Sequence, residues 1–379
     1  MTTTHVMVIL GTRPEVIKLA PVIREFGTRD GVRASICVTG QHRQMLHQML
    51  GVFGIEPDFD LDVMIDDQTL IDLSSSLPRG LDRILSSERP DFVLVQGDTT
   101  TALFAALVAF YHGIPVGHVE AGLRTPDKYY PFPEEMNRRL ISQLSDVHLA
   151  PTERARQNLI REKIDPESIA VTGNPVIDSL LEMVERGTPI GLDIDPDRNR
   201  IIVVTAHRRE NIGGPLTEIC LAVREIVADY PDVEVVFPVH LNPAVQKTVR
   251  GELGGVDRIH LTEPFDYPRF ASLLSCAYLI LSDSGGIQEE APSLGKPVLV
   301  LRDESERPEA VEAGTARVVG TKRQGIVDAA RTLLTDRSAY QQMARVANPF
   351  GDGKASPRIV DRCLCYLESC GRQGFRGSG

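Results

Sequence analysis

Residues 5–20 read HVMVILGTRPEVIKLA, and this stretch decides the fold. An almost wholly apolar run comes first, which is typical of a β-strand buried on both faces of a sheet. A short turn at residues 11–13 follows, and Pro14 then opens a segment with the apolar spacing of a helix. The stretch therefore predicts a strand, a tight turn and a covering helix, which is the first step of a parallel α/β sheet.

The same alternation continues along the chain. Apolar runs rich in Val and Ile predict further buried strands at residues 34–38, 92–96, 116–119, 147–150 and 170–172, and the pattern restarts at residues 201–204, 233–239, 258–261, 278–281, 298–301 and 316–318. The turn-rich, acidic residues 187–200 predict a linker between the two halves. We therefore predict an α/β fold of two Rossmann-like, doubly wound parallel-sheet domains. They span residues 1–186 and 187–356, and residues 357–379 form a C-terminal helix that crosses back, followed by a tail. We expect ligands to bind in the inter-domain cleft.

Composition excludes several classes of protein. The 379 residues are 42% hydrophobic and 25% charged, which is typical of a globular protein, and the net charge of −11 would repel nucleic acid and anionic membranes. The longest apolar stretch, residues 102–110, is much shorter than the roughly 20 residues that cross a bilayer. The six cysteines are scattered and form no Cys-x-x-Cys pair. We expect a cytoplasmic protein with reduced thiols and without nucleic-acid or membrane partners.

A basic pair flanks the first turn. Arg13 lies in the turn itself, and Lys18 follows one helical turn after Pro14. Both could receive an anion at the helix N-terminus, where free backbone N–H groups gather. A capped helix with solvated charges is the alternative interpretation of this pair.

Three acidic positions are predicted to meet at the carboxyl ends of neighbouring strands. Asp98 lies in QGDTTT at residues 96–101, Glu120 follows the strand at residues 116–119, and Glu134 and Glu135 begin a helix after PFP. A helix N-cap explains Asp98 nearly as well, and the helix dipole explains Glu134. Glu120 stands directly before Ala-Gly and is not a cap. Their convergence favours acid-base chemistry.

The second half carries two polar groups after strands. TAHRRE at residues 205–210 places His207 after the end of a strand, where it could serve acid-base chemistry or hold a phosphate. SDSGGIQEE at residues 282–290 places Gly285 and Gly286 before a helix, as in phosphate-binding turns, and Glu290 could bind a ribose. An ordinary turn is the alternative. Dinucleotide, Walker and zinc motifs are missing in their required contexts, so we expect no cofactor and no metal.

These blocks together resemble the non-hydrolysing UDP-N-acetylglucosamine 2-epimerases. The resemblance rests on GTRPE (11–15), QGDTT (96–100), GHVEAGLR (117–124), TGNP (172–175), AHRREN (206–211) and DSGGIQEE (283–290), and it covers the chain from about Val6 to the last helix. It implies a glycosyltransferase-B-like pair of domains, a homodimer, and interconversion of UDP-GlcNAc and UDP-ManNAc. The reaction would eliminate UDP to give a 2-acetamidoglucal and then add UDP back.

The resemblance also implies roles for particular residues. Asp98, Glu120 and Glu134 would form the acid-base group, with His207 near the pyrophosphate or assisting proton transfer. Which acid serves which face of C2 is left open. The nucleotide would be held through its phosphates by Arg13, Lys18, Ser284, Gly285, Gly286 and Arg307, through its ribose by Glu290, and through its uracil by the segment from Phe265 to Phe270.

Many bacterial members of this family carry a second UDP-GlcNAc site at which substrate activates the enzyme. The matching positions here are Gln41, Gln44, Arg208 and His240. Members with that site place an arginine before the glutamine that matches Gln68, whereas this chain has Asp67. An acid facing a pyrophosphate weakens binding.

We therefore predict a hyperbolic dependence of initial rate on UDP-GlcNAc, and reaction of pure UDP-ManNAc without a lag. A sigmoidal curve, or a lag abolished by a trace of UDP-GlcNAc, would show that the activating site survives, either because Gln41, Gln44, Arg208 and His240 suffice or because Arg43 supplies the missing charge. Asp67→Arg is the control, and it should create or sharpen the sigmoidal response if the pocket is otherwise intact.

Three other functions share parts of this pattern. A glycosyltransferase of the same fold would use the same UDP contacts but needs an acceptor, and three acids around the sugar favour proton transfer instead. A hydrolysing epimerase would release ManNAc and UDP. A non-catalytic nucleotide-sugar sensor would keep Glu290 and the glycine pair but lose the acids.

Overall fold

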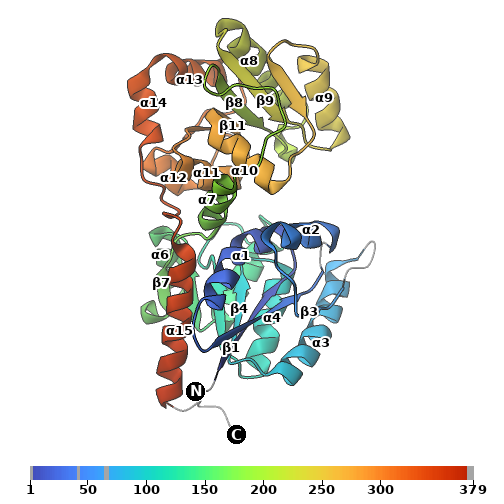
Figure 1. The fold of residues 1–379 in the computed structure, drawn as a ribbon, viewed down its shortest axis with the longest axis vertical. Helices are drawn as coiled ribbons and strands as arrows, with labels where there is room; N and C mark the ends of the chain where they lie inside the picture. Colours follow the sequence, from blue (N-terminus) through green and yellow to red (C-terminus); the bar gives the residue numbers. More distant parts are fainter. Residues whose placement is uncertain (1–2, 41–42, 64–67, 374–379) are drawn as a thin grey trace. The chain divides into compact units, whose positions relative to one another are not determined.

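The computed structural model describes residues 3–40, 43–63 and 68–373. The chain divides into two compact units, which are called unit 1 (residues 1–179 and 353–379) and unit 2 (residues 180–352). The division falls inside the helix α7 (Val176–Arg186), ahead of the turn-rich residues 187–200. Figure 1 shows the helices and strands with the labels used below.

Unit 1 is built on a seven-stranded sheet in the order β3-β2-β1-β4-β5-β6-β7, and every strand pair in it is parallel. Its strands are β1 (Thr4–Leu10), β2 (Val32–Val38), β3 (Phe59–Asp60), β4 (Phe92–Gln96), β5 (Val116–Val119), β6 (Val147–Ala150) and β7 (Ile169–Val171). Its helices are α1 (Arg13–Gly27), α2 (Arg43–Phe53), α3 (Leu70–Glu88), α4 (Thr100–Tyr111), α5 (Glu134–Leu144), α6 (Glu153–Arg161) and α15 (Ala355–Gln373), with a 3-10 turn at Pro166–Ser168.

Unit 2 repeats this plan with a six-stranded parallel sheet in the order β10-β9-β8-β11-β12-β13. Its strands are β8 (Arg200–Thr205), β9 (Val233–Pro238), β10 (Ile259–Thr262), β11 (Ala277–Ser282), β12 (Val298–Val300) and β13 (Ala316–Val318). Its helices are α8 (Gly214–Asp229), α9 (Pro243–Leu253), α10 (Tyr267–Cys276), α11 (Gly285–Glu290), α12 (Pro308–Ala313), α13 (Arg323–Thr335) and α14 (Arg337–Ala344), with 3-10 turns at Arg209–Asn211 and Ala291–Leu294.

The predicted α/β class with two doubly wound parallel sheets is confirmed. Each strand that the sequence predicts is present, with its ends shifted by at most about two residues. The prediction missed β3, which pairs through Cys37 with Phe59 and is too short to leave an apolar run in the sequence. No helix within the described residues is both long and apolar enough to cross a membrane.

The core follows from the apolar runs themselves. In β1, residues 6–10 are all fully buried, because helices cover both faces of the parallel sheet. The helix α1 begins after Thr12 with Pro14 in its first turn, and it buries one face that includes Val16, Leu19 and Phe26. Burying each such side chain contributes about 1.5 to 3 kcal/mol, so the sheet is held rigidly beneath the turns at its carboxyl edge.

The last helix belongs to the first unit. The chain returns after unit 2, and α15 packs against α1 and β6. Its fully buried residues are Ile359, Val360 and Cys363. Arg29, in the turn after α1, pairs with Asp361 of α15 at 2.8 Å. Unit 1 is therefore built from two stretches of sequence that lie far apart in the chain.

Candidate active site

Each sheet has one point at which the strand order reverses. In unit 1 this point lies between β1 and β4, and in unit 2 it lies between β8 and β11. The turns after these strands carry Arg13 and Asp98 in unit 1, and His207 and Ser284 in unit 2. Ligands of doubly wound sheets bind outside the carboxyl ends of the strands at such points. These four predicted site residues therefore lie at the sheet edges where doubly wound folds bind their ligands.

Glu120 is the most constrained of the predicted acids. It follows β5, is 7% exposed, and has φ of 66°, in the left-handed region. Its carboxylate accepts hydrogen bonds from Lys18 Nζ at 2.6 and 2.7 Å, from Asn174 Nδ2 at 3.2 Å, and from Gln96 Nε2. A non-glycine residue in this backbone region costs roughly 1 to 2 kcal/mol. Strain of this kind gathers at functional sites, and here it aims a fixed carboxylate from the sheet edge.

The structure places Lys18 on this acid. The Lys18 ammonium lies 2.6 Å from Glu120 Oε1, and its side chain is 17% exposed. The sequence suggested a phosphate ligand at this position. In the protein as described, Lys18 balances the charge of Glu120 and restricts its orientation, and its role as a phosphate ligand stays a prediction.

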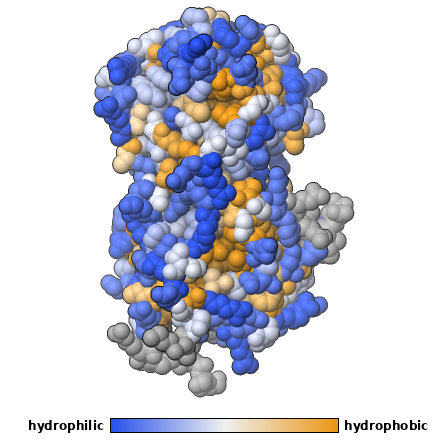
Figure 2. Space-filling view, viewed as in Figure 1, coloured by the Kyte–Doolittle hydropathy of each residue, from blue (hydrophilic) through white to orange (hydrophobic). Residues whose placement is uncertain are grey.

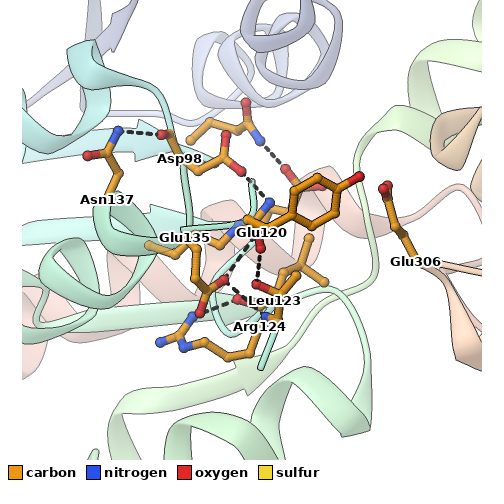
Figure 3. Close-up of polar contacts among 12 residues, drawn as sticks. Asp98, Glu120, Leu123, Arg124, Glu135, Asn137 and Glu306 are labelled. Carbon is orange, nitrogen blue, oxygen red and sulfur yellow. Dashed lines mark hydrogen bonds and ion pairs between the residues drawn. The ribbon is translucent and has the colours of Figure 1, made fainter. Parts of the chain in front are cut away.

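Asp98 is held by α5. Its Oδ2 pairs with Arg138 Nη2 at 2.6 Å, and its carbonyl oxygen accepts from Asn137 Nδ2 at 2.8 Å (Figure 3). Asp98 is not the N-cap of α4, which was the alternative interpretation of this residue. Thr99 takes that role, since its hydroxyl accepts from the Ala102 N–H at 3.0 Å. The carboxylate of Asp98 is thereby left to pair with a cation at the strand edge.

The first turn of α5 carries two acids with different surroundings. Glu134 is half-buried, and no hydrogen bond or ion pair of its carboxylate is found within the described part of the chain. Glu135 is fully buried and accepts from the Thr125 N–H at 3.0 Å, from Arg138 at 3.1 Å and from Arg139 at 2.8 Å (Figure 3). Glu135 therefore organises the loop before α5, whereas Glu134 remains available for chemistry.

Glu15 joins the two turns at the edge of this sheet. It is 1% exposed, and its carboxylate accepts from the Gly11 N–H at 3.0 Å, from the Thr12 hydroxyl at 2.7 Å and from the Thr99 hydroxyl at 2.8 Å. Burial raises the pKa of Glu15 to about 7. Gly11 is required here, because a Cβ would lie 2.4 Å from the hydroxyl oxygens of Thr39 and Thr101. Glu15 thus holds together the turn at Arg13 and the turn that contains Asp98, and the side chain of Arg13 is exposed.

The buried side chain of His118 also holds the carboxyl edge of the unit 1 sheet in place. His118 in β5 is fully buried, and its Nε2 lies 2.7 Å from the carbonyl oxygen of Gly97. Burial lowers the pKa of His118 to about 3, so the ring is neutral and donates from Nε2. It fixes the residue that precedes Asp98.

In unit 2, His207 lies beside a buried acid. Its Nδ1 is 3.3 Å from Asp283 Oδ1, and its ring stacks on the ring of His240 with centroids 5.7 Å apart. The His207 side chain is 40% exposed; burial of the rest of the ring is the largest influence on its pKa and lowers it, and Asp283 opposes that effect. The predicted catalytic histidine therefore has a carboxylate partner that the sequence did not indicate.

The predicted nucleotide contacts gather around α11. Ser284 precedes this short helix, Gly285 and Gly286 begin it, and Glu290 ends it. Glu290 is 8% exposed and accepts from the Tyr267 hydroxyl at 3.1 Å. A Cβ on Gly285 would lie 3.7 Å from the guanidinium carbon of Arg307, so this cation borders the turn. Arg307 also pairs with Glu289. In the segment predicted to bind uracil, the guanidinium carbon of Arg269 lies 4.7 Å from the ring centroid of Phe265, and Phe270 is half-buried in α10.

The residues matched to an activating site are only partly described. Gln41 and Asp67 lie outside the described residues, as does the side chain of Gln44. Arg208 donates to Glu306 at 3.0 Å, and His240 is exposed. The rate curve predicted from Asp67 stays a prediction.

The sequence did not identify the residues that bind the predicted site side chains and hold them in place. Gln96 is the last residue of β4 and Asn174 follows β7, so their places at strand ends were a usable signal. Arg138 and Asp283 gave no such signal. Arg138 lies 40 residues after its partner Asp98 in the chain (138 − 98), and Asp283 lies 76 residues after its partner His207 (283 − 207). Among the described residues, no group of three or more His, Cys, Asp and Glu side chains could hold a metal ion.

Residues 24–363 match the family described as UDP-N-acetylglucosamine 2-epimerase. A UDP-N-acetylglucosamine 2-epimerase of Yersinia pestis is 52% identical over 367 residues, which is 94% of this chain and 97% of that protein. Another, of Bacillus subtilis, is 49% identical over 361 residues and 95% of each chain. The crystal structure of UDP-GlcNAc 2-epimerase from Neisseria meningitidis bound to UDP-GlcNAc superimposes with a TM-score of 0.86, at 46% identity, covering 96% of this chain and all of that one.

Proposed function

This chain belongs to the UDP-N-acetylglucosamine 2-epimerase family, and from that premise we propose that it interconverts UDP-GlcNAc and UDP-ManNAc without releasing free sugar. The observation that carries the proposal is the acidic edge of unit 1, where Asp98 and Glu120 are each held by a cation. Proton transfer at one carbon needs groups of this kind in fixed positions. Unit 2 supplies the turn and acid that suit a nucleotide.

The chemistry explains why acids and an anion-binding turn occur in one protein. No carbonyl group neighbours C2 of the sugar, so the C2 proton is not acidic enough for direct removal and return. In the proposed route a base takes this proton while the C1–O bond to UDP breaks, and the electron pair forms the C1=C2 bond of a 2-acetamidoglucal. C2 then receives a proton on the opposite face, and a phosphate oxygen of UDP re-forms the bond to C1.

We assign the residues accordingly. Asp98, Glu120 and Glu134 exchange protons at the sugar, with Arg138 and Lys18 holding the first two carboxylates in place. In unit 2, Ser284, Gly285, Gly286 and Arg307 bind the phosphates, Glu290 binds the ribose, and residues 265–270 bind the uracil. Arg13 adds positive charge for the leaving pyrophosphate, and His207 assists its departure. Stabilising that leaving group supplies the largest share of the catalysis in this scheme.

The test is proton NMR of UDP-GlcNAc with the enzyme in deuterated water. Product and recovered substrate should both carry solvent deuterium at C2, with no added nicotinamide cofactor or metal, because elimination releases the original proton. Product that keeps its C2 proton would exclude the elimination route. A transferase would show no exchange without an acceptor, and a hydrolysing enzyme would accumulate free ManNAc and UDP.

We further propose that the protein is a cytoplasmic homodimer. Cys37, Cys220 and Cys363 are buried free thiols, as is usual in reducing compartments. Ile71 of α3 and Phe110 and Tyr111 of α4 are between 59% and 74% exposed. Figure 2 shows apolar side chains gathered on the visible face of unit 1. Apolar patches on a globular protein commonly mark contacts between subunits.

A further inference from the structure

The two central strands of unit 2 end side by side. Thr205 of β8 is in register with Ser282 of β11, and their hydroxyl oxygens are 2.7 Å apart. The chain leaves β8 towards His207 and leaves β11 towards Asp283, whose N–H donates to the Thr205 carbonyl at 3.2 Å. His207 and Asp283 therefore meet where the strand order of the sheet reverses.

Asp283 is fully buried, and its two oxygens face different groups. Oδ2 accepts from the backbone N–H groups of His207 and Arg208, each at 2.8 Å, and from Asn211 Nδ2 at 3.0 Å. Oδ1 lies 3.3 Å from Nδ1 of His207, within ion-pair distance, and it accepts no hydrogen bond within the described part of the chain. One oxygen thus holds the turn after β8, and the other faces the imidazole.

We propose that Asp283 is a positioning residue that keeps the proton of neutral His207 on Nδ1, so that Nε2 is the nitrogen that exchanges protons during the reaction. The inference rests on the proposed function, in which His207 assists the departure of the pyrophosphate. A carboxylate oxygen carries negative charge and no hydrogen, so at 3.3 Å it attracts an N–H and repels the lone pair of a bare ring nitrogen, and the nitrogen that faces it carries hydrogen. The nitrogen on the far side of the ring is then left to act as acid or base.

The charges around the ring explain why such a partner is needed. Burial disfavours the charged imidazole, and the neighbouring His240 and Arg208 oppose it as well, so the pKa of His207 lies below its ordinary value. Asp283 is the group that acts in the other direction. It therefore orients the ring and also stabilises the imidazolium that would form when Nε2 takes up a proton.

A role in anchoring the turn alone is the competing explanation, and Asp283→Asn separates the two. The carbonyl oxygen of Asn can still accept from the three N–H donors that Oδ2 binds. Its amide nitrogen then takes the place of Oδ1 and donates to His207 Nδ1. The turn is retained while the neutral ring is forced to carry its proton on Nε2.

Nitrogen-15 NMR of protein labelled in histidine reads the tautomer directly, and His207→Gln identifies the signal. The neutral ring should carry hydrogen on Nδ1 in the wild type and on Nε2 in Asp283→Asn. We expect turnover of Asp283→Asn to fall at least about a hundredfold, in the range for lost acid-base catalysis, with KM changed less than about threefold. In a His207→Gln background, Asp283→Asn should cause no further loss.

Asn211→Ala is the matched control, because it removes one anchor of the turn and leaves the contact between Asp283 and the ring. It should keep the wild-type tautomer and lower turnover by no more than about threefold. An unchanged tautomer in Asp283→Asn, or equal losses of turnover in both variants, would overturn the proposal. The wild-type enzyme in deuterated water tests the proposed function separately, since failure of C2 exchange there concerns the reaction and not the position of the ring.

Discussion

Replacing Asp98 by Asn, Glu120 by Gln or Glu134 by Gln is expected to lower turnover at least about a hundredfold, whereas UDP affinity should change much less. Each substitution keeps the size of the side chain and removes its ability to exchange a proton. Loss of general acid-base catalysis typically costs 10²- to 10⁴-fold in rate, on the order of 3 to 5 kcal/mol in the barrier. Steady-state kinetics with UDP-GlcNAc measures the first effect, and calorimetry with UDP measures the second.

Asp91→Asn is the matched control for these variants. Asp91 stands before β4 and accepts from the His5 N–H at 2.8 Å, so it occupies the opposite end of the strand that leads to Asp98. Its replacement should leave turnover nearly unchanged. If one of the three acid variants keeps more than about half of the normal turnover, the acid concerned has a structural role and its assignment is wrong.

Glu290→Ala is expected to weaken UDP binding by roughly 1.5 to 3 kcal/mol, the range for hydrogen bonds to a charged group. This corresponds to an increase in Kd of about 10- to 150-fold. The reason is that the buried carboxylate at the end of α11 is proposed to accept from the ribose hydroxyls. Titration calorimetry with UDP gives the value directly.

Tyr267→Phe controls for disturbance around Glu290. Tyr267 lies in the segment proposed to bind the uracil, and this substitution keeps its ring there and keeps the Glu290 carboxylate, while it removes the hydroxyl that donates to Glu290 Oε1 at 3.1 Å. UDP affinity of this variant should stay within about threefold of the wild type. An unchanged Kd in Glu290→Ala would mean that residues 282–290 form an ordinary turn and helix.

The fold could be predicted from sequence because its signals are local. Parallel strands covered on both faces leave continuous apolar runs, and the run at residues 6–10 is fully buried as expected. β3 has only the two residues Phe59 and Asp60, so it leaves no such run. Pairing with the longer β2 creates this strand, and no short-range pattern encodes it.

The candidate site was predictable in its position but not in its contacts. Asp98 and Glu120 were located from the strand ends that they follow. The two interpretations of Asp98 could not be separated until Thr99 was seen to cap α4 and Arg138 to pair with the carboxylate. The position of Lys18 after a helix N-terminus predicts a phosphate ligand, whereas its contact with Glu120 at 2.6 Å could not be predicted from the sequence. Contacts of this kind depend on tertiary packing and produce no periodic pattern in the amino-acid sequence.

The return of α15 to unit 1 has a consequence for biosynthesis. The ribosome completes residues 1–179 before it makes residues 180–352, which takes roughly ten to thirty seconds at about 5 to 20 residues per second. During that interval the sheet of unit 1 is present without the helix that buries Ile359 and Val360 against it. The nascent chain must therefore keep an apolar surface uncovered while its second unit folds. A chaperone that binds this surface would act on the nascent chain until α15 emerges from the ribosome.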